Sequence, residues 1–598
     1  MSVKFTFISV LAVLFIGLEV HSQSNTFNWA FDIGVAGNNE YIDEMVTDLE
    51  GNIVVVGTIG WGETIDFDPS SSTNNVYFDT ENFFIAKYSS DKELLWVKPF
   101  INDSLLNFEN INLLIDNQNN IWLVGGIGTF KNEQNIYAQI DFDPSPSATY
   151  YLRPEGYENL FVLKLDETGS FITANLTGNG TDIYTDYIYP YTAVLDNDYN
   201  LLIAGRFNNS MDFEFGSGQT ILTSVDVEGY NGDDAFIAKY SSDLSLLWIK
   251  QGIADRFEIR DIDVDNQNNM YMIGYCSDYY GDVIDLDFGT GNNIVDPSGY
   301  DPFIMKYAAD GNFVVGNIFK GYNYQDDYLK SIDIDDSDNV FVVGNFSDSI
   351  DVDISNSVLM LHPVAFGNQN LIVAKYNSNI ELQSAKSIGN VNDCHINAKQ
   401  ILFKNNELFI CGEFSGNIDF DPSNEVFFVS TTDGVYTDGF LLKMNENIDF
   451  VHAFNLGGNY VDHVEAIALD QNSNLFVAGR YSMTIDFDYS TTNYTLTTDD
   501  TRQIYVAKYN TAIVGMNEIK NQNFILVYPN PANNVINIAV PLTETIESIK
   551  IYNQNGQLVK QIFKPNTEKI NISDLKTGIY FIRTDTDTNR YLSKMIKD

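Results

Sequence analysis

The sequence predicts an all-β fold, a seven-bladed β-propeller followed by a small immunoglobulin-like β-sandwich. Three observations support this. A short acidic signature recurs seven times at a period of about seventy residues, each copy contains four strand-like segments, and no helical periodicity appears. The signature begins at Asp66, Asp141, Asp212, Asp285, Asp351, Asp419 and Asp486. Four strands per repeat are typical of a propeller blade. An elongated solenoid is the alternative, but solenoid repeats are usually shorter and need capping units.

The first copy illustrates the four expected strands. Residues 44–48 lead through a Gly-Asn turn into the apolar run 53–57. The acidic signature follows, and then come two more β-like runs at 84–88 and 94–98. Short β-branched and aromatic runs separated by turn residues are typical of hairpins.

Two polar landmarks keep their place in the repeat. An asparagine stands five residues before a strand glycine in six copies, whereas the sixth copy has Glu407 in a turn that is one residue shorter. A lysine occurs in every third strand, at Lys87, Lys164, Lys239, Lys306, Lys375, Lys443 and Lys508. Residues shared by all copies are expected to be structural, and residues found in one copy are candidates for function.

The seventh copy lacks a fourth strand and ends near Tyr509, whereas the segment 27–31, with Trp29 at its centre, stands alone before the first copy. It is similar to the fourth strands around Trp96 and Trp248. We therefore expect the N-terminal strand to complete the seventh blade, so that residues 27–510 close without an exposed sheet edge.

A family resemblance appears at these residues. The run 265–274, which reads DNQNNMYMIG, with the acidic element after it, resembles the SBBP-type bacterial β-propeller repeat. The resemblance covers residues 27–510 and implies a fold with little chemistry, because propellers host many functions.

The two ends of the chain read as export signals. Residues 1–22 resemble a signal peptide, with Lys4, an apolar stretch and a small-residue cleavage site. No later segment reaches eighteen uninterrupted apolar residues, so no transmembrane segment is expected. After a linker at 511–523, short strands separated by turns predict a small sandwich over 524–598. Cys276, Cys394 and Cys411 form no disulfide or zinc spacing, and buried inert thiols are expected.

Motifs in the last segment are similar to the type IX secretion (Por) C-terminal sorting domain of Bacteroidota. The residues that carry the resemblance are Tyr528, Pro529, Asn530, Pro531, Gly556, Gly578, Tyr580, Lys594 and Lys597. The resemblance implies passage to the periplasm, recognition by the type IX machinery, and a secreted or cell-surface location. It also implies removal of the tail, with the protein then anchored or released. An accessory immunoglobulin-like domain without a sorting role is the alternative.

The formal net charge of −49 repels nucleic acid and anionic membranes, which excludes both as partners, and we expect a monomer. The acid pairs Asp66 and Asp68, Asp141 and Asp143, and Asp419 and Asp421 are candidate metal ligands, because both carboxylates of a pair point to one side of an extended chain. Calcium is the cation that such oxygen ligands would take. The alternative is that they cap loop amides or pair with the repeated lysine, and sevenfold recurrence favours this structural role. No cofactor is required.

Loop length differs among the copies. The interval from strand glycine to acidic signature is seven residues in four copies, but nine, sixteen and eleven in the first, second and fourth. These insertions carry the candidate ligand-binding residues Trp61, Phe130, Tyr137, Tyr279 and Tyr280. Aromatic faces rimmed by acids and amides suit sugars or peptides. Length drift with the aromatics packed at the blade edge is the alternative.

Catalytic residues are not predicted. The few histidines show no metal-pair spacing, and His395 and His463, which precede the first strands of their copies, read as ordinary loop residues. We therefore expect a non-enzymatic binding or adhesion module for a polysaccharide or protein. The alternatives are a glycan- or peptide-processing enzyme with acids on the loop face, and a calcium-stabilised structural adhesin.

Overall fold

The computed structural model contains strands and no helix among the residues it describes. These are residues 27–34, 40–60, 62–78, 82–100, 106–129, 139–154, 157–177, 185–225, 232–253, 257–277, 283–297, 299–321, 327–363, 369–389, 395–423, 425–432, 434, 436–488, 494–498, 502–510, 526–528, 532–539, 545–553, 558–565, 569–586 and 590–597. The chain divides into two compact units, Met1–Val514 and Gly515–Asp598.

The larger unit contains seven sets of four antiparallel strands. The first four sets are β2(Tyr41–Thr47), β3(Ile53–Ile59), β6(Asn82–Tyr88), β7(Leu94–Phe100); β8(Leu106–Ile115), β9(Ile121–Thr129), β12(Glu158–Leu165), β13(Phe171–Thr177); β14(Tyr187–Leu195), β15(Leu201–Asn208), β18(Asp234–Tyr240), β19(Leu246–Gly252); and β20(Phe257–Val264), β21(Met270–Ser277), β24(Tyr300–Tyr307), β25(Phe313–Ile318). The other three are β27(Tyr328–Ile334), β28(Val340–Phe346), β31(Asn370–Tyr376), β32(Leu382–Ile388); β33(Ile396–Lys404), β34(Glu407–Ser415), β37(Thr437–Asn445), β38(Phe450–Gly458); and β39(His463–Leu469), β40(Asn474–Tyr481), β43(Gln503–Asn510), β1(Phe27–Ile33). One bridge, between Glu158 and Tyr187, links the second and third sets.

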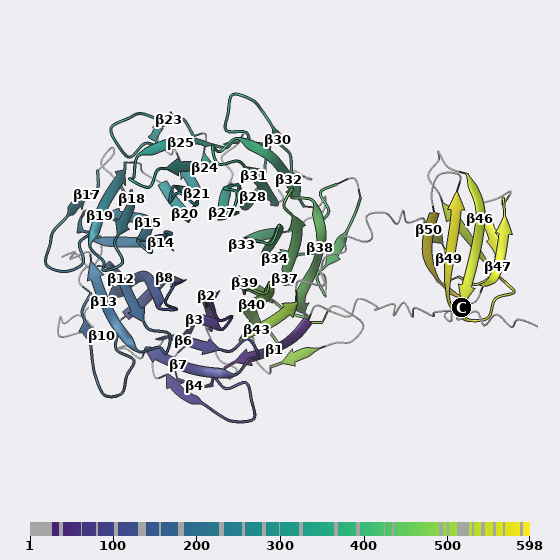
Figure 1. The fold of residues 1–598 in the computed structure, drawn as a ribbon, viewed down its shortest axis with the longest axis horizontal. Coiled ribbons are helices and arrows are strands. Elements are labelled where there is room, and N and C mark those ends of the chain that lie inside the picture. The colour runs from purple at the N-terminus through teal and green to yellow at the C-terminus, as the bar shows by residue number, and fades with distance from the viewer. Residues whose placement is uncertain are drawn as a thin grey trace, which may run out of the picture. The chain divides into compact units, whose positions relative to one another are not determined.

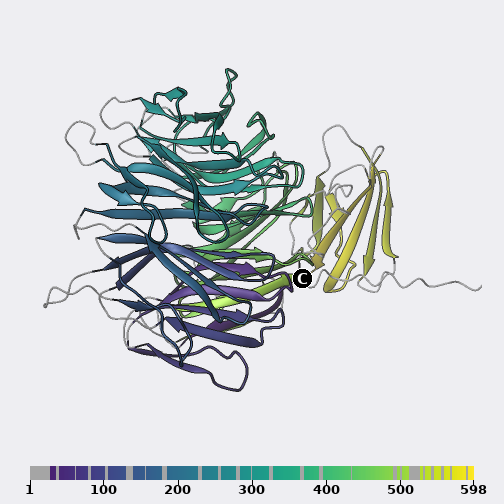
Figure 2. The same ribbon diagram turned by 60° about the vertical axis from the view of Figure 1, so that its left-hand side comes forward.

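The first strand of each set lies nearest the centre of a ring of sheets (Figure 1), and Figure 2 shows the same sheets from an oblique direction. Neighbouring first strands contact each other in the order β2, β8, β14, β20, β27, β33, β39, and β39 contacts β2 again. The seventh set contains the first and last described strands of the larger unit, because β1 pairs with β43 and Trp29 lies opposite Lys508. The strand pairing expected from the sequence is therefore present.

A short hairpin follows the second strand of each set, which the sequence analysis did not predict. The acidic signature begins at the end of its first strand. The hairpins are β4(Glu63–Asp66) with β5(Asn75–Phe78), β10(Ile140–Asp141) with β11(Tyr151–Leu152), β16(Ser210–Asp212) with β17(Ile221–Thr223), β22(Ile284–Asp285) with β23(Ile294–Val295), β29(Ile350–Asp351) with β30(Met360–Leu361), β35(Asn417–Asp419) with β36(Phe428–Ser430), and β41(Thr484–Asp486) with β42(Thr495–Thr497). The two-residue strand β26(Lys320–Gly321) also pairs with β29.

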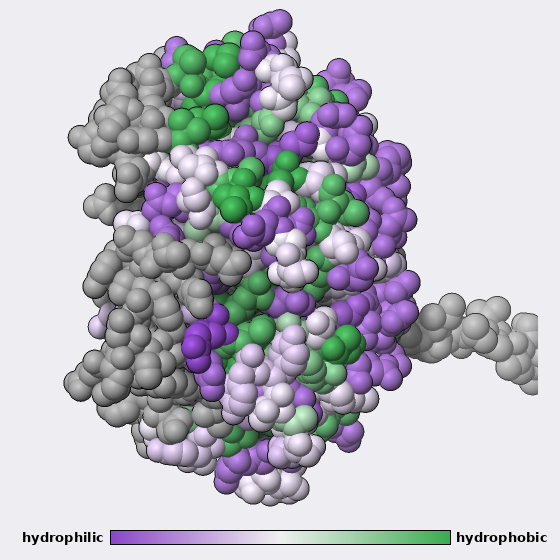
Figure 3. Space-filling view, turned by 90° about the vertical axis from the view of Figure 1, so that its left-hand side faces the viewer, coloured by the Kyte–Doolittle hydropathy of each residue, from purple (hydrophilic) through white to green (hydrophobic). Residues whose placement is uncertain are grey.

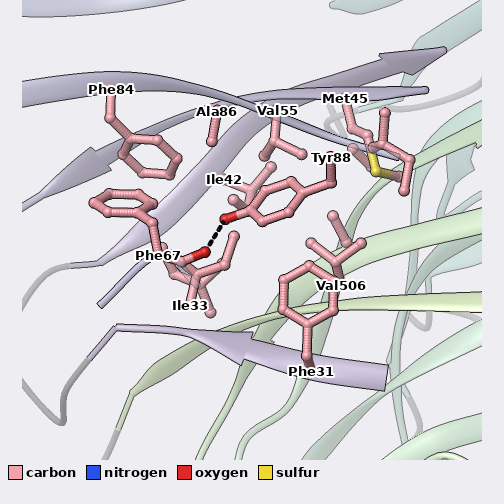
Figure 4. Packing of buried hydrophobic residues seen from close by; sticks show 14 of the residues in the cluster. Phe31, Ile33, Ile42, Met45, Val55, Phe67, Phe84, Ala86, Tyr88 and Val506 are labelled. Atoms are coloured by element: carbon pink, nitrogen blue, oxygen red, sulfur yellow. Dashed lines mark hydrogen bonds between the residues drawn. The ribbon is translucent and has the colours of Figure 1, made fainter. Parts of the chain in front are cut away.

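The apolar residue of each signature anchors its hairpin in the core. Phe67 is buried, and its carbonyl oxygen accepts a hydrogen bond of 3.1 Å from the Tyr88 hydroxyl, as Figure 4 shows. Phe31 of β1 packs against Tyr88 with ring centroids 5.0 Å apart, and Val506 of β43 belongs to the same cluster. The N-terminal strand therefore contributes to the core between the seventh and first sets.

In five of the sets the repeated lysine donates a hydrogen bond to a carbonyl of the next set. The Lys87 ammonium lies 2.8 Å from Asp48 in the turn between β2 and β3, and it also donates to the Glu167 carbonyl of the next set at 3.1 Å. Across the closure of the ring, Lys508 donates to the Ser90 carbonyl at 2.9 Å. The Lys87 ammonium and the Asp48 carboxylate are both largely buried. The ammonium therefore needs the ion pair as well as the hydrogen bond to the next set.

The sixth set keeps this ion pair by a different route. In the other sets the repeated asparagine binds the turn aspartate, as Asn52 does with Asp48 at 2.9 Å. Here the turn is shorter, Lys404 lies opposite Glu407 in the strand register, and Glu407 binds Lys443 at 2.7 Å. The substitution of Glu407 for asparagine therefore supplies the carboxylate that Lys443 requires.

The strand glycine is required by a β-bulge in the first strand. In the fourth set, Ile259 lies opposite Gly274, and Arg260 is the extra residue before Asp261. A Cβ at position 274 would lie 1.8 Å from the Glu258 carbonyl oxygen. The same close approach, at 2.6 Å or less, occurs at Gly57, Gly205, Gly344, Gly412 and Gly479. Glycine recurs at this position of the repeat because the bulge leaves no room for a Cβ atom there.

The smaller unit contains two antiparallel sheets. One has the order β44(Leu526–Tyr528), β45(Val535–Ala539), β48(Lys569–Asn571); the other has the order β47(Leu558–Phe563), β46(Ile546–Asn553), β49(Gly578–Thr586), β50(Arg590–Lys597). Its core includes Ile536, Ile549 and Ile582. Of the sorting residues, Tyr580 is buried and donates to the Lys576 carbonyl at 2.8 Å, and Lys597 pairs with Gly578. Tyr528 lies in β44 and Lys594 in β50, while residues 529–531 and 556 are outside the described residues.

The outer strands of the ring carry scattered apolar side chains. Ile172 on β13, Ile221 on β17 and Leu247 on β19 are about half exposed, and Figure 3 shows apolar and polar side chains interspersed on this face. No helix in the described part of the chain has the length and apolarity needed to cross a bilayer. Cys276 and Cys411 are buried free thiols, as expected, and Cys394 lies outside the described residues.

The bulge predicts that Gly274→Ala destabilises the larger unit by about 3 kcal/mol or more, because either the Cβ or the Glu258 carbonyl must move. The midpoint of urea unfolding measures the change. Gly218→Ala is the matched control, because its nearest neighbour is the flexible Glu214 side chain at 3.3 Å, and a change within about 0.5 kcal/mol is expected. Equal midpoints for the two variants would contradict the steric explanation.

Candidate functional site

The aromatic residues predicted to bind a ligand are not among the residues that the structure describes. Trp61, Phe130, Tyr137, Tyr279 and Tyr280 all lie outside the described residues. Their role stays a prediction, and the site described below is built from other residues.

The predicted metal ligands bind the backbone of their own hairpins. One oxygen of Asp66 accepts hydrogen bonds from the amides of Asp68, at 3.1 Å, and Asn74, at 2.8 Å. The first aspartate of every signature accepts the same two amide hydrogen bonds, including Asp141 and Asp419. Asp68, Asp143 and Asp421 each accept one amide two residues later.

These contacts explain the recurrence of the acid pairs through loop capping. The other structural suggestion, that the repeated lysines pair with these acids, is wrong, because the lysine ion pairs go to residues such as Asp48, Asp116 and Asp196. Among the described residues, no group of three or more His, Cys, Asp or Glu side chains is arranged to hold a metal ion. Calcium binding by the acid pairs stays a prediction.

Asp66→Ala is expected to destabilise the protein by about 1–2 kcal/mol, because two amides lose their acceptor. Asp66→Asn keeps the oxygen acceptor and should retain most of the stability. Thermal unfolding with and without a chelator measures both variants. If Asp66 acts mainly as a calcium ligand, Asn will be as harmful as Ala, and chelator will reproduce the loss in the unmodified protein.

Two positions of the repeat carry different residues from set to set: the bulged residue and the residue after the strand glycine. The bulged residue is Asp43, Tyr191, Arg260, Lys330, Lys399 or Glu465 in six of the sets. The residue after the strand glycine is Thr58, Arg206, Tyr275, Asn345, Glu413 or Arg480 in the same sets. The first strands lie nearest the ring centre (Figure 1) and contact one another, so residues at these positions come from neighbouring repeats that adjoin each other.

Tyrosines and arginines gather where the third set meets the fourth. The Arg206 guanidinium lies 5.2 Å from the Tyr189 ring centroid and 5.7 Å from that of Tyr191. Arg260 lies 5.0 Å from the Tyr191 ring and 5.3 Å from the Tyr275 ring. All five side chains are partly exposed. Rings and guanidinium groups therefore form one mixed surface, stabilised by cation–π attraction.

Two carboxylates balance these arginines. Arg206 lies 3.0 Å from Asp233 and 3.7 Å from Glu258, and Glu258 lies 2.5 Å from Arg260. The cluster thus combines aromatic faces, hydrogen-bond donors and acceptors in one place, which are the elements of a ligand-binding surface. We call Tyr189, Tyr191, Arg206, Arg260 and Tyr275 the tyrosine–arginine cluster.

A second charged group lies on the sixth and seventh sets. Glu465 binds Lys399 at 3.1 Å and Arg480 at 3.3 Å. Glu413 is paired with His463, which begins β39 and so is not the loop residue that the sequence analysis expected. Burial alone would raise the pKa of Glu413, but the hydrogen bond and charge of His463 outweigh it and lower the pKa to about 2. Glu413 is therefore ionised at neutral pH.

Partly buried polar side chains connect neighbouring first strands along the ring. Asn112 accepts from the Ala193 amide at 3.0 Å, Asp261 from the Ile332 amide at 3.0 Å, and Gln400 from the Ile467 amide at 2.8 Å. Glu44 accepts from the Leu113 amide in the same way. These bonds hold the strands that carry the bulged residues at a fixed spacing.

Three carboxyl groups on the first strands have a pKa raised to near neutral pH or above it. Burial raises the pKa of Glu44 to about 8, an effect that the Leu113 amide only partly offsets. Burial likewise raises the pKa of Asp43 and of Asp333 to about 7. The folded protein therefore holds protons that the unfolded chain releases above about pH 4.

Stability is expected to fall as pH rises from about 5 to 8, since the unfolded state loses protons that the folded state retains, at roughly 1.4 kcal/mol per pH unit for each such group. Glu44→Gln removes one of these groups. Its melting temperature relative to the unmodified protein should therefore increase between pH 5 and pH 8. Glu93→Gln, at an exposed position, should show a constant difference. Parallel pH profiles for the unmodified protein and Glu44→Gln would contradict a proton held at Glu44.

The sequence contained a signal for this site that loop lengths did not reveal. When the copies are aligned on the strand glycine, Arg206, Glu413 and Arg480 fall at the same position, directly after that glycine. The other copies have different residues there. The bulged position itself can be recognised only from the strand register.

Comparisons with known proteins identify the C-terminal segment. Residues 526–598 match the Secretion system C-terminal sorting domain. Over 413 residues, 59% of this chain, the sequence is 22% identical to an uncharacterized WD repeat-containing protein of Acanthamoeba polyphaga mimivirus. The chain spans 26% of the length of that relative.

Two solved structures are similar at low identity. A protein of unknown function from Dyadobacter fermentans is 10% identical, with 81% of this chain and 98% of that chain covered and a TM-score of 0.35. Sqt1 from Chaetomium thermophilum is 9% identical, with 76% and 97% covered and a TM-score of 0.31. The sorting domain shows that the protein is a type IX-secreted or cell-surface protein.

Proposed function

We propose that the larger unit is a seven-bladed β-propeller that binds an extracellular polysaccharide at the centre of its ring, without catalysis. Seven sets of four antiparallel strands, with β1 completing the last set, support the propeller. The relative named for its WD repeats supports it as well, since WD repeats form propeller blades. The repeat is of the SBBP type in this proposal, and the propeller covers residues 27–510.

The observation that carries the binding function is the tyrosine–arginine cluster. Its rings are partly exposed, its donors and acceptors lie within 4 Å of one another, and its residues occur in one part of a repetitive ring. A purely structural feature would recur in every set, as the loop-capping aspartates do. Aromatic faces next to a few fixed polar groups suit the apolar faces and hydroxyl groups of sugars.

A saccharide chain fits the extent of the site better than a protein partner. A stable protein interface needs about 800 Å² on each partner. The tyrosine–arginine cluster occupies the junction of two sets, whereas the outer face in Figure 3 has apolar side chains interspersed with polar ones. Export to the cell surface places the site where polysaccharides are abundant.

The remaining parts of the chain serve export in this proposal. Residues 1–22 are a signal peptide, 511–523 a linker, and 524–598 an immunoglobulin-like sandwich that the type IX machinery recognises and removes. The two sheets of the smaller unit support the sandwich. The protein then acts as a monomeric adhesion module at the surface of a member of the Bacteroidota.

Glycan-array binding by the full-length protein tests this function. Tyr191→Ala should weaken binding to the recognised glycan at least tenfold, because the ring between both arginines is lost. Tyr77→Ala, on the exposed face of β5, is the control and should bind normally. Equal melting temperatures for the variants confirm that folding is intact.

Two results would contradict the proposal. Binding that Tyr191→Ala leaves unchanged would place the ligand elsewhere. Shortening of the bound glycan during incubation, detected by chromatography, would indicate an enzyme instead.

A further inference from the structure

Three neighbouring first strands each place a cation at the bulged position. These residues are Arg260 on β20, Lys330 on β27 and Lys399 on β33. The strands contact one another in this order, so the three side chains occupy equivalent places in successive sets. We call them the bulge cations.

The middle cation differs from its neighbours. Arg260 lies 2.5 Å from Glu258, and Lys399 lies 3.1 Å from Glu465. Among the described residues, no carboxylate lies within 4 Å of the Lys330 ammonium. Burial is the main cause that lowers the pKa of Lys330 to about 8; repulsion by Lys399 and Arg260 lowers the pKa further, and the charges of Asp261 and Glu465 oppose this effect. Lys330 is still mostly protonated at neutral pH.

This concentration of positive charge is unusual for the chain. The protein has 82 acidic and 33 basic residues, and yet three cations occupy successive bulges. In the part of the chain that the structure describes, only the outer two form an ion pair within 4 Å, while Asp261 and Glu465 act on Lys330 from farther away. Like charges held together inside a protein raise its free energy unless an anion lies between them. A partly buried ammonium with cations on both sides has the electrostatics of an anion site.

The tyrosine–arginine cluster adjoins this group, because Arg260 belongs to both. Tyr191 lies over the Arg260 guanidinium at 5.0 Å, and Arg260 is one set away from Lys330. A sugar ring against the tyrosines would therefore lie next to the bulge cations. Uronate carboxylates and sulfate esters are the anionic groups that polysaccharides carry.

We propose that the bulge cations select an acidic polysaccharide, with Lys330 binding the carboxylate or sulfate of a sugar whose ring contacts the tyrosine–arginine cluster. This inference rests on the proposed function and names its ligand class. The acidic outer surface opposes a long polyanion, but at physiological salt charges beyond about 8 Å are largely screened. The local cations therefore decide binding of a short anionic segment.

Calorimetric titration of the full-length protein with three short oligosaccharides of equal length tests the proposal. The probes are oligogalacturonate, sulfated dextran fragments and neutral dextran fragments. We expect binding of at least one acidic probe and an affinity for neutral dextran at least tenfold weaker. The two acidic probes distinguish a carboxylate from a sulfate ligand.

Lys330→Gln should lower the affinity for the acidic probe at least tenfold, and Lys330→Arg should retain most of it. Lys386→Gln is the matched control, since it removes the same charge from the outer strand β32 of the same set and should change the affinity less than twofold. Melting temperatures establish that each variant is folded. If Lys330→Gln does not fold, Lys399→Gln replaces it, with the same expected loss.

The two levels of the proposal fail differently. Binding of neutral and acidic probes with equal affinity, unaffected by Lys330→Gln, overturns the anion site and leaves polysaccharide binding intact. An absence of binding to every probe and to every glycan on the array overturns both. Loss of acidic-probe binding in Lys386→Gln would show that overall charge, rather than the bulge cations, is responsible.

Discussion

Hydrogen bonding between β1 and β43 brings the two ends of the larger unit into one sheet, and the remaining geometry depends on it. With β1 in place, the core between the seventh and first sets contains Phe31 and Val506 together with Tyr88. Lys508 then reaches the Ser90 carbonyl, and β39 meets β2. Without this pairing β43 would be an exposed edge strand, and the first strands would not be held around a common centre.

Within the closed ring, each set satisfies the same local requirements with small variations. In six sets the strand glycine accommodates the bulge, in five the repeated lysine forms an ion pair with a carboxylate, and in all seven the signature aspartate caps its hairpin. In the sixth set Glu407 replaces the turn aspartate as the partner of the repeated lysine. The ion pair is therefore kept although the acidic residue differs. The bulged position carries none of these requirements, which leaves it free to differ from set to set.

Much of this arrangement follows from periodicity in the sequence. Repeat length and alternating apolar runs predict the four strands of each set, and a lone tryptophan strand predicts its pairing with the last. The roles of polar residues were harder to predict. The lysines and signature aspartates recur together, and yet they bind different partners, because the turn aspartate is nearer to the lysine in space. The tyrosine–arginine cluster was missed because a bulge shifts the strand register by one residue, which spacing alone does not reveal.

The position of β43 also has a mechanical consequence. It lies between β1 and β40, and the smaller unit follows it in the chain. A pull on residue 510 along the strand would load the hydrogen bonds to both neighbours in parallel, which resists rupture far better than opening them one by one. A pull that separated Phe27 from Tyr509 would instead peel β1 away from that end. Force applied to residue 510 along β43 thus loads the sheet in its stronger direction.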